Sequence, residues 1–277
     1  MQLSIQHTTQ YHYSQPLNYI IQQLRLTPQD GYGQRVKNWS ITVNGQLSQH
    51  QDTFGNVVHT VVLDGHHAEF SVVAKGEVET GFPIKADEER LPLMIYLRHT
   101  GLTQPSAEIK TFAEGFEPIT SAEVLIRLSE AILKRVPYVK GVTGVNTSAK
   151  QAFEEGKGVC QDHAHIFIAC CRSIGVPARY VSGYLFIDDG HLLESHAWAD
   201  AWVHGIGWVS VDVSNACLVD GAHVRLATGL DYHDACPVSG VRVGGGTESM
   251  EAGVNVSQVG TKKQSRQMQS QIEQIQQ

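Results

Sequence analysis

Apolar and polar residues alternate with a period of two through much of the first hundred residues, and this period indicates β-strands. The alternating segments are residues 4–8, 20–26, 39–43, 56–62 and 68–74. Turn-forming residues separate them at Asn44-Gly45, Phe54-Gly55-Asn56 and Asp64-Gly65. Because no helical period lies between these segments, residues 1–103 are predicted to form a β-rich, sandwich-like N-terminal domain.

The period changes to that of a helix after residue 104. Apolar positions at helical spacing predict helices over 121–133, 148–155 and 160–174. Ser148 is a suitable N-cap for the second helix, and Gly175 and Pro177 end the third. Strands are then predicted at 178–185, 196–203 and 208–213, with a last strand at 253–259. We therefore expect an α+β core with closing strands over residues 104–260.

The last segment, residues 261–277, is polar and rich in glutamine. Such a composition predicts a disordered tail. Met268, Ile272 and Ile275 have helical spacing, so a weak partner-binding helix is the alternative.

The helix predicted from residue 160 begins with a cysteine. Its apolar stripe, which must be buried, consists of Ala164, Phe167, Ile168, Cys171 and Ile174. Cys160 therefore lies where a buried helix reaches a surface or cleft, and there the helix dipole favours a thiolate. Gly156 and Gly158 remove side chains from the approach to it. A lone cysteine at a helix start is more often a small core residue, so the case for a nucleophile depends on its partners.

The hairpin at 196–213 supplies these partners. Alanine and valine occupy alternate positions from 197 to 203 and must face the core, so His196 and Asp212 share the opposite face. If Trp202 pairs with Trp208, His196 lies opposite Ser214 and Asp212 is its diagonal neighbour, about 7–8 Å away between backbones. A thiol, an imidazole and a carboxylate so arranged favour a cysteine nucleophile, its base and the group that orients the base.

Other polar residues are weaker candidates for these roles. His163 and His165 project from other sides of the nucleophile helix and are expected to pack or hydrogen-bond locally. Asp162 lies in its first turn, where a carboxylate complements the helix dipole and can accept an N–H. Asp200 shares the face of His196 but lies about 13 Å along the same strand. Asp212 is therefore the preferred carboxylate.

Four segments in order resemble the core of the transglutaminase-like superfamily: Gly158–His165, Gly175–Tyr184, Ser195–Trp198 and Gly207–Asp212. More narrowly, the chain resembles the bacterial branch labelled predicted cysteine proteases, which places a β-rich region before the core. The resemblance implies a papain-like core, a helix-borne cysteine packed on an antiparallel sheet, with Cys160 as nucleophile, His196 as base and acid, and Asp212 as orienter. The family aspartate is commonly followed by proline, whereas Val213 follows here.

Composition narrows the possible partners. The net charge is -7, with 21 basic and 28 acidic residues and no basic cluster, so nucleic acid and anionic membranes are not expected partners. The longest apolar runs are too short to span a bilayer, and residues 1–7 lack the features of a secretory signal. Five cysteines, an odd number, favour free thiols in a reducing cytoplasm.

The resemblance implies acyl transfer at a peptide or glutamine-type amide of a peptide or protein substrate. Cys160 attacks the carbonyl, His196 protonates the leaving amine, and water or a second amine resolves the thioester. The backbone N–H of Cys160 is a natural oxyanion donor, and Gln161, Trp198 and Tyr138 are candidates for the second donor. No metal or other cofactor is required, and the N-terminal histidines lack metal-ligand spacing.

Three other functions stay open on the sequence. A true protein cross-linking transglutaminase uses the same acyl-enzyme as the leading candidate, a cysteine peptidase or amidase. A binding module that keeps the fold without turnover belongs to a different class, and an intact triad counts against it. A metal protein is the weakest alternative, since the chain has no CxxC or HxxxH pair.

Overall fold

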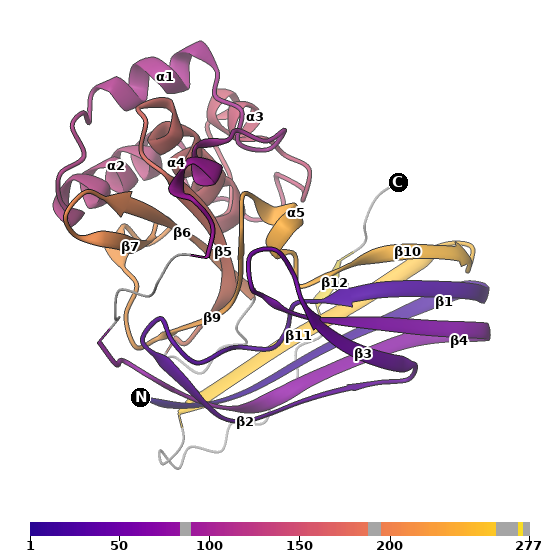
Figure 1. The fold of residues 1–277 in the computed structure, drawn as a ribbon. Helices are drawn as coiled ribbons and strands as arrows, with labels where there is room; N and C mark the ends of the chain where they lie inside the picture. Colours follow the sequence, from indigo (N-terminus) through magenta and orange to yellow (C-terminus); the bar gives the residue numbers. More distant parts are fainter. Residues whose placement is uncertain (84–89, 188–194, 259–270, 274–277) are drawn as a thin grey trace.

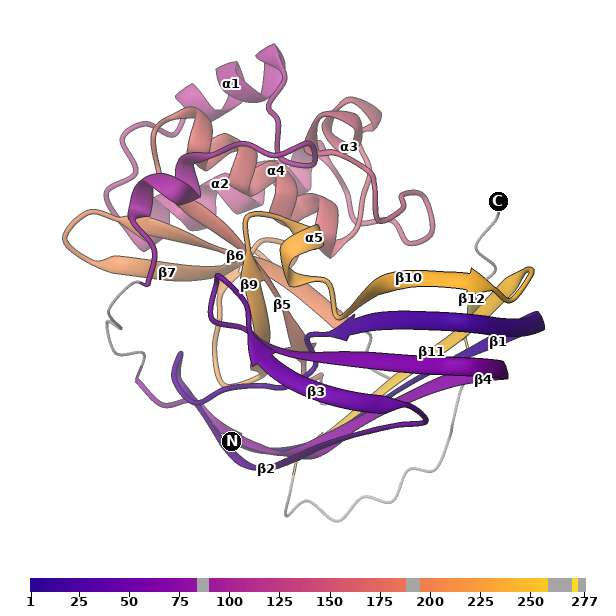
Figure 2. The same cartoon turned by 45° about the vertical axis from the view of Figure 1, so that its right-hand side comes forward.

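Two β-sheets and a layer of helices organise this computed structural model, which describes residues 1–83, 90–187, 195–258 and 271–273 (Figure 1). One sheet has seven strands and the other has five. The helices α1 to α4 lie on the face of the five-stranded sheet that points away from the seven-stranded sheet (Figure 2). The five-stranded sheet is therefore the middle layer, and both of its faces are covered.

The seven-stranded sheet is built on β1 (Gln2–Leu24) and β4 (Val57–Thr80), which pair antiparallel along most of their length. β2 (Gln34–Val43) and β3 (Gln46–Gln51) pair with the other edge of β4. The predicted β-rich N-terminal region is confirmed. Four of its predicted strands, however, are halves of two long ones, because β1 and β4 each contain two of the alternating segments.

The turn predicted at Asp64-Gly65 is wrong, because these residues form a bulge inside β4. Tyr19 pairs with Asp64 while Leu17 pairs with His67, so β4 holds an extra residue at this point. Gly65 has a φ of 97°, which a glycine adopts without strain. The local break in strand geometry is real, but the chain continues in the same direction through it.

β10 (Val238–Gly244) and β11 (Glu248–Gln258) pair with the remaining edge of β1. The predicted last strand overlaps β11. The sequence predicts that it belongs to the core over residues 104–260, whereas the structure places it in the N-terminal sheet. The reason is apolar burial, because Val254 and Val256 pair with β1 and lie in the same apolar core as Leu3 and Ile5. Strands from both predicted domains therefore share one sheet.

The predicted Gln-rich tail, residues 261–277, lies outside the described residues except for one short strand. This strand, β12 (Gln271–Glu273), pairs antiparallel with β11.

The middle sheet is antiparallel, in the order β8-β7-β6-β5-β9. Its strands are β5 (Ala178–Leu185), β6 (Ser195–Val203), β7 (Gly207–Asp212), β8 (Cys217–Leu218) and β9 (His223–Gly229). The three strands predicted for this region correspond to β5, β6 and β7. The mixed α+β fold is therefore confirmed.

Helix α4 (Cys160–Ser173) packs on this sheet, and its apolar residues share one core with the three alanines and Val203 of β6. The other helical segments are η1 (Leu93–Leu97), α1 (Ala107–Glu114), α2 (Ala122–Arg135), α3 (Ala149–Glu155) and α5 (Tyr232–Ala235). The predicted helices match α2, α3 and α4, whereas α1 was not predicted because it buries little more than Ile109 and Ala113. Within the described residues, no helix has the length and apolar character needed to cross a membrane.

The predicted N-cap of α3 is confirmed. The Ser148 hydroxyl accepts the N–H of Gln151, and the Gln151 side chain accepts the N–H of Ser148. Gly156 ends the helix in the left-handed region, with a φ of 66°. This sharp stop directs the chain toward the start of α4.

Two side-chain amides from the N-terminal region cover the free edge of β9. The side chain of Gln34 accepts the N–H of Arg225 at 2.8 Å and donates to its carbonyl at 2.9 Å. Asn56 does the same for Thr228, at 2.8 and 2.7 Å. Buried backbone groups on this edge strand thus find partners, which fixes the two sheets against each other.

We predict that Gln34→Leu and Asn56→Leu each destabilise the protein by about 1–3 kcal/mol, because each leaves buried backbone groups of β9 without a partner. The matched control is Gln46→Leu on the exposed strand β3, which we expect to change stability by less than about 0.5 kcal/mol. Urea denaturation followed by circular dichroism measures the difference. Equal free energies of unfolding for the three variants would contradict this account of the interface.

Candidate active site

Cys160 is the first residue of α4 and is partly exposed. The chain leading into it is held by a parallel bridge between Tyr138 and Gly158, with the N–H of Val139 donating to the Gly158 carbonyl at 2.8 Å. The other cysteines of α4, Cys170 and Cys171, are fully buried, and burial raises the pKa of both thiols. The predicted contrast between one accessible cysteine and two core cysteines is confirmed.

Asp162 caps α4, as predicted. Its Oδ2 accepts the N–H of Val159 at 2.8 Å and the hydroxyl of Thr143 at 2.7 Å. Burial raises the pKa of Asp162, and these two hydrogen bonds oppose the shift. Gly158 makes room for this carboxylate, because a Cβ there would lie 2.8 Å from the Asp162 Cβ. Gly158 thus accommodates the helix cap, a reason that the sequence alone did not indicate.

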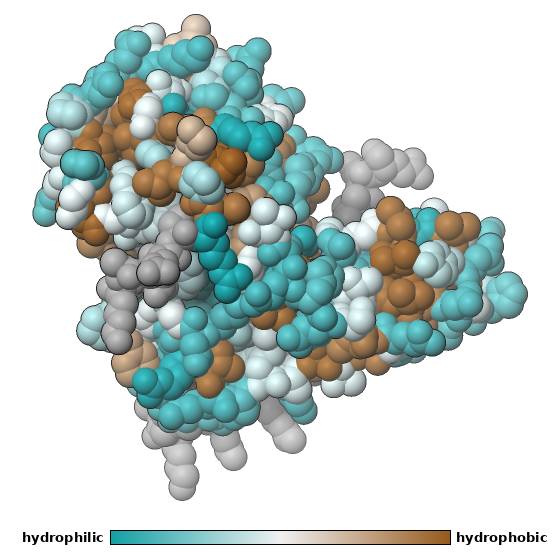
Figure 3. Space-filling model, in the orientation of Figure 1, coloured by the Kyte–Doolittle hydropathy of each residue, from teal (hydrophilic) through white to brown (hydrophobic). Residues whose placement is uncertain are grey.

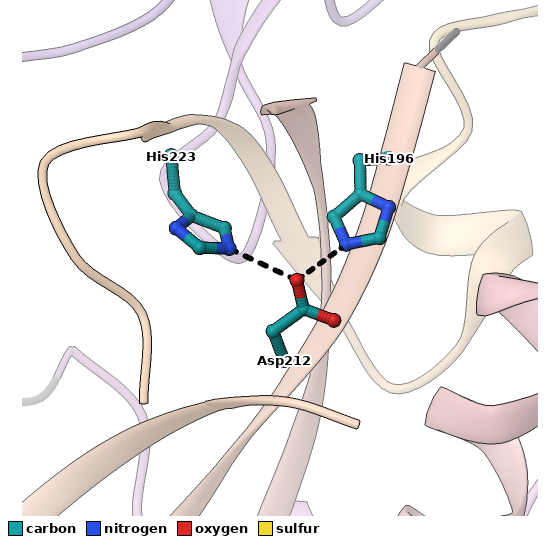
Figure 4. Close-up of side chains that lie close together, drawn as sticks. All are labelled: His196, Asp212 and His223. Carbon is teal, nitrogen blue, oxygen red and sulfur yellow. Dashed lines mark hydrogen bonds and ion pairs between the residues drawn. The ribbon is translucent and has the colours of Figure 1, made fainter. Parts of the chain in front are cut away.

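His196 and Asp212 lie side by side on the face of β6 and β7 that points away from α4. The predicted pairing of Trp202 with Trp208 is confirmed, but the ladder does not extend to the predicted pair of His196 with Ser214. His196 Nε2 and Asp212 Oδ2 are 2.7 Å apart, with the carboxylate fully buried (Figure 4). The ladder between the two strands ends at Ala199 and Val211, where the chain turns toward β8.

The side chain of Cys160 completes the group. Since Nε2 of His196 contacts Asp212, Nδ1 is the nitrogen left for Cys160. Burial alone would lower the pKa of His196, but hydrogen bonds with Asp212 and Cys160, together with their charges, raise it to about 10. Burial also opposes ionisation of Asp212, yet the hydrogen bonds from His196 and His223 hold its pKa well below the usual range. The structure therefore brings the three predicted residues together, and their catalytic roles stay a prediction.

The two rival histidines have structural partners. His163 Nε2 lies 2.8 Å from the Val136 carbonyl, and burial lowers the pKa of this imidazole. His165 Nε2 accepts the N–H of Tyr232 at 3.2 Å, and burial lowers its pKa to about 3, so the ring is neutral. Both histidines therefore bind backbone groups, as expected of packed side chains.

Asp200, the rival carboxylate, belongs to a separate buried cluster. Arg225 binds it with two hydrogen bonds of 2.8 Å, and Arg179 Nε donates to it at 2.8 Å. Burial opposes its ionisation, but the two guanidinium groups lower its pKa to about 2. Asp200 is thus bound by two buried arginines, which supports Asp212 as the preferred partner of His196.

The candidate second oxyanion donors lie in different surroundings. Gln161 Nε2 donates to the Val145 carbonyl at 3.0 Å, which ties a surface loop to α4. Tyr138 is exposed, with its ring 5.9 Å from that of His163. Trp198 is fully buried beside His196, over Gly183, whose missing side chain leaves room for the indole. The choice among the three stays a prediction.

Comparison with known proteins agrees with this geometry. Residues 3–79 match the bacterial transglutaminase-like N-terminal region, and residues 110–213 match the transglutaminase-like superfamily. An uncharacterised protein of Mycobacterium leprae (strain TN) is 30% identical over 286 residues, which cover 93% of this chain and 99% of that protein. The chain belongs to the transglutaminase-like superfamily.

Two further proteins show how far the transglutaminase-like resemblance extends. The crystal structure of a candidate cysteine protease from Cytophaga hutchinsonii covers 97% of this chain and 94% of its own, with a TM-score of 0.77 at 22% identity, and shows the same fold. A protein-glutamine gamma-glutamyltransferase of Pseudomonas aeruginosa is 29% identical over 124 residues, 39% of this chain and 18% of that protein.

Two residues that were not predicted from the sequence, His223 and Asn215, contact the Asp212 carboxylate. His223 Nε2 lies 3.0 Å from Asp212 Oδ2, and Asn215 Nδ2 donates to the same oxygen at 2.7 Å. His223 comes from β9, a strand that was not predicted. The signal that could have found it is the alternation of His223 and Arg225 with apolar Val224 and Leu226, which places both polar residues on the face of Asp212.

His196, Asp212 and His223 also form the one group of possible metal ligands among the described residues, with ligand atoms within 4.8 Å of one another. The distances of 2.7 and 3.0 Å from the histidine nitrogens to Oδ2 are ordinary hydrogen-bond lengths. These hydrogen bonds account for the grouping, and the expectation that the transglutaminase-like chemistry uses no metal stays a prediction.

The raised pKa of His196 predicts a dependence of stability on pH. Its folded pKa of about 10 lies above the ordinary value of 6.5, so the stabilisation is complete below pH 6.5 and is lost as pH rises through about 10. Asp212→Asn removes the charge that favours the imidazolium, so this variant should lose less stability than the wild type over that interval. Melting temperatures measured between these pH values test the difference. The control Asp64→Asn, at the exposed bulge of β4, should follow the wild type, and parallel curves for wild type and Asp212→Asn would contradict the assignment.

Proposed function

We propose that the protein is a cysteine-nucleophile enzyme that acts on peptide-type amides through a thioester, with Cys160, His196 and Asp212 as its triad. The observation that carries the proposal is the continuous link from Cys160 through His196 to the buried Asp212 carboxylate. A thiol at a helix N-terminus, an imidazole within hydrogen-bond reach and a carboxylate behind it have the arrangement that nucleophilic acyl transfer requires.

In the proposed reaction, the sulfur of Cys160 attacks the amide carbonyl carbon while His196 holds the proton that the thiol has given up. The tetrahedral oxyanion forms beside the N-terminus of α4, where the backbone N–H of Cys160 can donate to it. His196 then passes its proton to the nitrogen of the leaving amine, and the C–N bond breaks to leave a thioester. Water or a second amine attacks the thioester, His196 accepts its proton, and the thiol is restored.

Asp212 supports both proton transfers without taking a proton itself. Its buried oxygen accepts a hydrogen bond from Nε2–H of His196, so the opposite nitrogen stays directed toward Cys160. A positively charged imidazole is favoured at this position, as the raised pKa of His196 indicates. Because the charge that appears on His196 meets a carboxylate already in place, little reorganisation is needed during the reaction.

The substrate class follows from the chemistry of a cysteine nucleophile assisted by an imidazole, which acts on acyl carbons such as those of amides. Hydrolysis of the thioester is the leading reaction, and transfer of the acyl group to a second amine is the alternative. The protein-glutamine gamma-glutamyltransferase of Pseudomonas aeruginosa, similar over 39% of this chain, is compatible with transfer to an amine. A peptide or protein is thus the proposed partner.

We predict that Cys160→Ala lowers the rate of amide-bond cleavage by at least ~10³-fold, since loss of a nucleophile removes the covalent route. Fluorescein-labelled casein reports cleavage, and covalent incorporation of dansylcadaverine into unlabelled casein reports amine transfer. Cys217→Ala removes the exposed thiol of β8, on the strand that pairs with Asp212, and serves as the matched control, with activity expected to stay at the wild-type level.

Equal activity of Cys160→Ala and wild type in both assays would overturn the proposal. Wild-type protein that shows neither cleavage nor amine incorporation with any of a panel of protein substrates would favour the non-catalytic binding module instead.

A further inference from the structure

The Asp212 carboxylate has two histidine neighbours, and the triad uses one of them. Figure 4 shows His196, from β6, and His223, from the start of β9, with a nitrogen of each ring directed at the same oxygen. The distances to Oδ2 are 2.7 Å for His196 and 3.0 Å for His223. His223 is almost fully buried, at 6% exposure, so its bond to the carboxylate is shielded from water.

The other ring nitrogen of His223 decides which atom carries the proton. Nδ1 lies 3.2 Å from the backbone N–H of Asp220 and 3.0 Å from its Oδ1. If the ring is neutral and Nδ1 accepts the backbone N–H, the proton is on Nε2. If the ring is charged, Nδ1 donates to the Asp220 carboxylate and Nε2 is protonated as well. In both states Nε2 donates to Asp212.

The ring of His223 is also fixed by packing. It meets the buried indole of Trp198 edge to face, with 5.5 Å between ring centroids, and that indole lies 6.2 Å from the ring of His196. A histidine held at both nitrogens and packed against an indole can hold a neighbouring group in place.

We propose that His223 is a positioning residue that fixes the orientation of the Asp212 carboxylate and, through it, turns Nδ1 of His196 toward Cys160. This inference rests on the proposed function, because it extends the triad by one residue. Asn215, three residues after Asp212, donates to the same oxygen at 2.7 Å, so His223 and Asn215 both hold the carboxylate that His196 contacts. Its hydrogen bond also helps to keep Asp212 ionised.

A matched pair of amide variants tests the proposal. His223→Gln places an amide nitrogen near the position of Nε2 and keeps a donor to Asp212. The side chain of His223→Asn reaches only the position of Nδ1, so this variant keeps a polar group beside Asp220 and loses the donor to Asp212. His223→Leu removes both. The second-order rate of Cys160 alkylation by iodoacetamide, read by mass spectrometry, reports the state of the site without a known substrate.

We expect the rate of Cys160 alkylation in His223→Gln to stay within about 3-fold of wild type. In His223→Asn and His223→Leu the rate should fall by about 10-fold or more, because both lose the hydrogen-bond donor to Asp212. Melting temperatures confirm that the compared variants are folded, and the pair of amides still decides the question if the leucine variant is not. With casein as substrate, the loss in His223→Asn should fall on kcat and leave KM unchanged.

Equal alkylation rates for His223→Asn and His223→Gln would overturn the inference and leave the proposed function standing, provided wild-type Cys160 reacts faster than the exposed Cys217. A wild-type Cys160 that reacts no faster than Cys217 would overturn the proposed function, and the inference with it.

Discussion

Strand β6 has two buried faces, and the rest of the site depends on the register that assigns each side chain to its face. Its alanines and Val203 face α4, whose first residue is Cys160, and its polar and aromatic residues lie on the opposite face. A slip of one residue in the β6–β7 register would exchange the two faces and move His196 into the apolar core. The pairing of Trp202 with Trp208 therefore sets the position of His196 relative to both Cys160 and Asp212.

Two buried carboxylates share the polar face of β6 and β7 but have different partners. Asp200 is held by two arginines, which satisfy it fully and fix it as part of the interface between the sheets. Asp212 is held by two histidines and an asparagine, and one of those histidines reaches Cys160. Permanent charges surround the structural carboxylate, whereas two histidines, which can exchange a proton, contact the other.

Much of this arrangement could be predicted from the sequence, because it depends on local periodicity. Alternation in the hairpin placed His196 and Asp212 on one face, and the apolar stripe of α4 placed Cys160 at its exposed end. His223 and the arginine partners of Asp200 could not be assigned in the same way, since their contacts join segments far apart in the chain. The last strand has the same explanation, because the alternation of Val254 and Val256 indicates burial but not in which sheet.

The central claim is that Cys160 attacks acyl carbons with the help of His196 and Asp212. Incubation with p-nitrophenyl acetate, followed by peptide mapping, tests it most directly, because the reagent is activated and bypasses the unknown substrate. The account predicts a burst of nitrophenol with an acetyl group on Cys160, and loss of both in His196→Ala. Acetyl groups spread over Cys217 and surface lysines, without preference for Cys160, would contradict it.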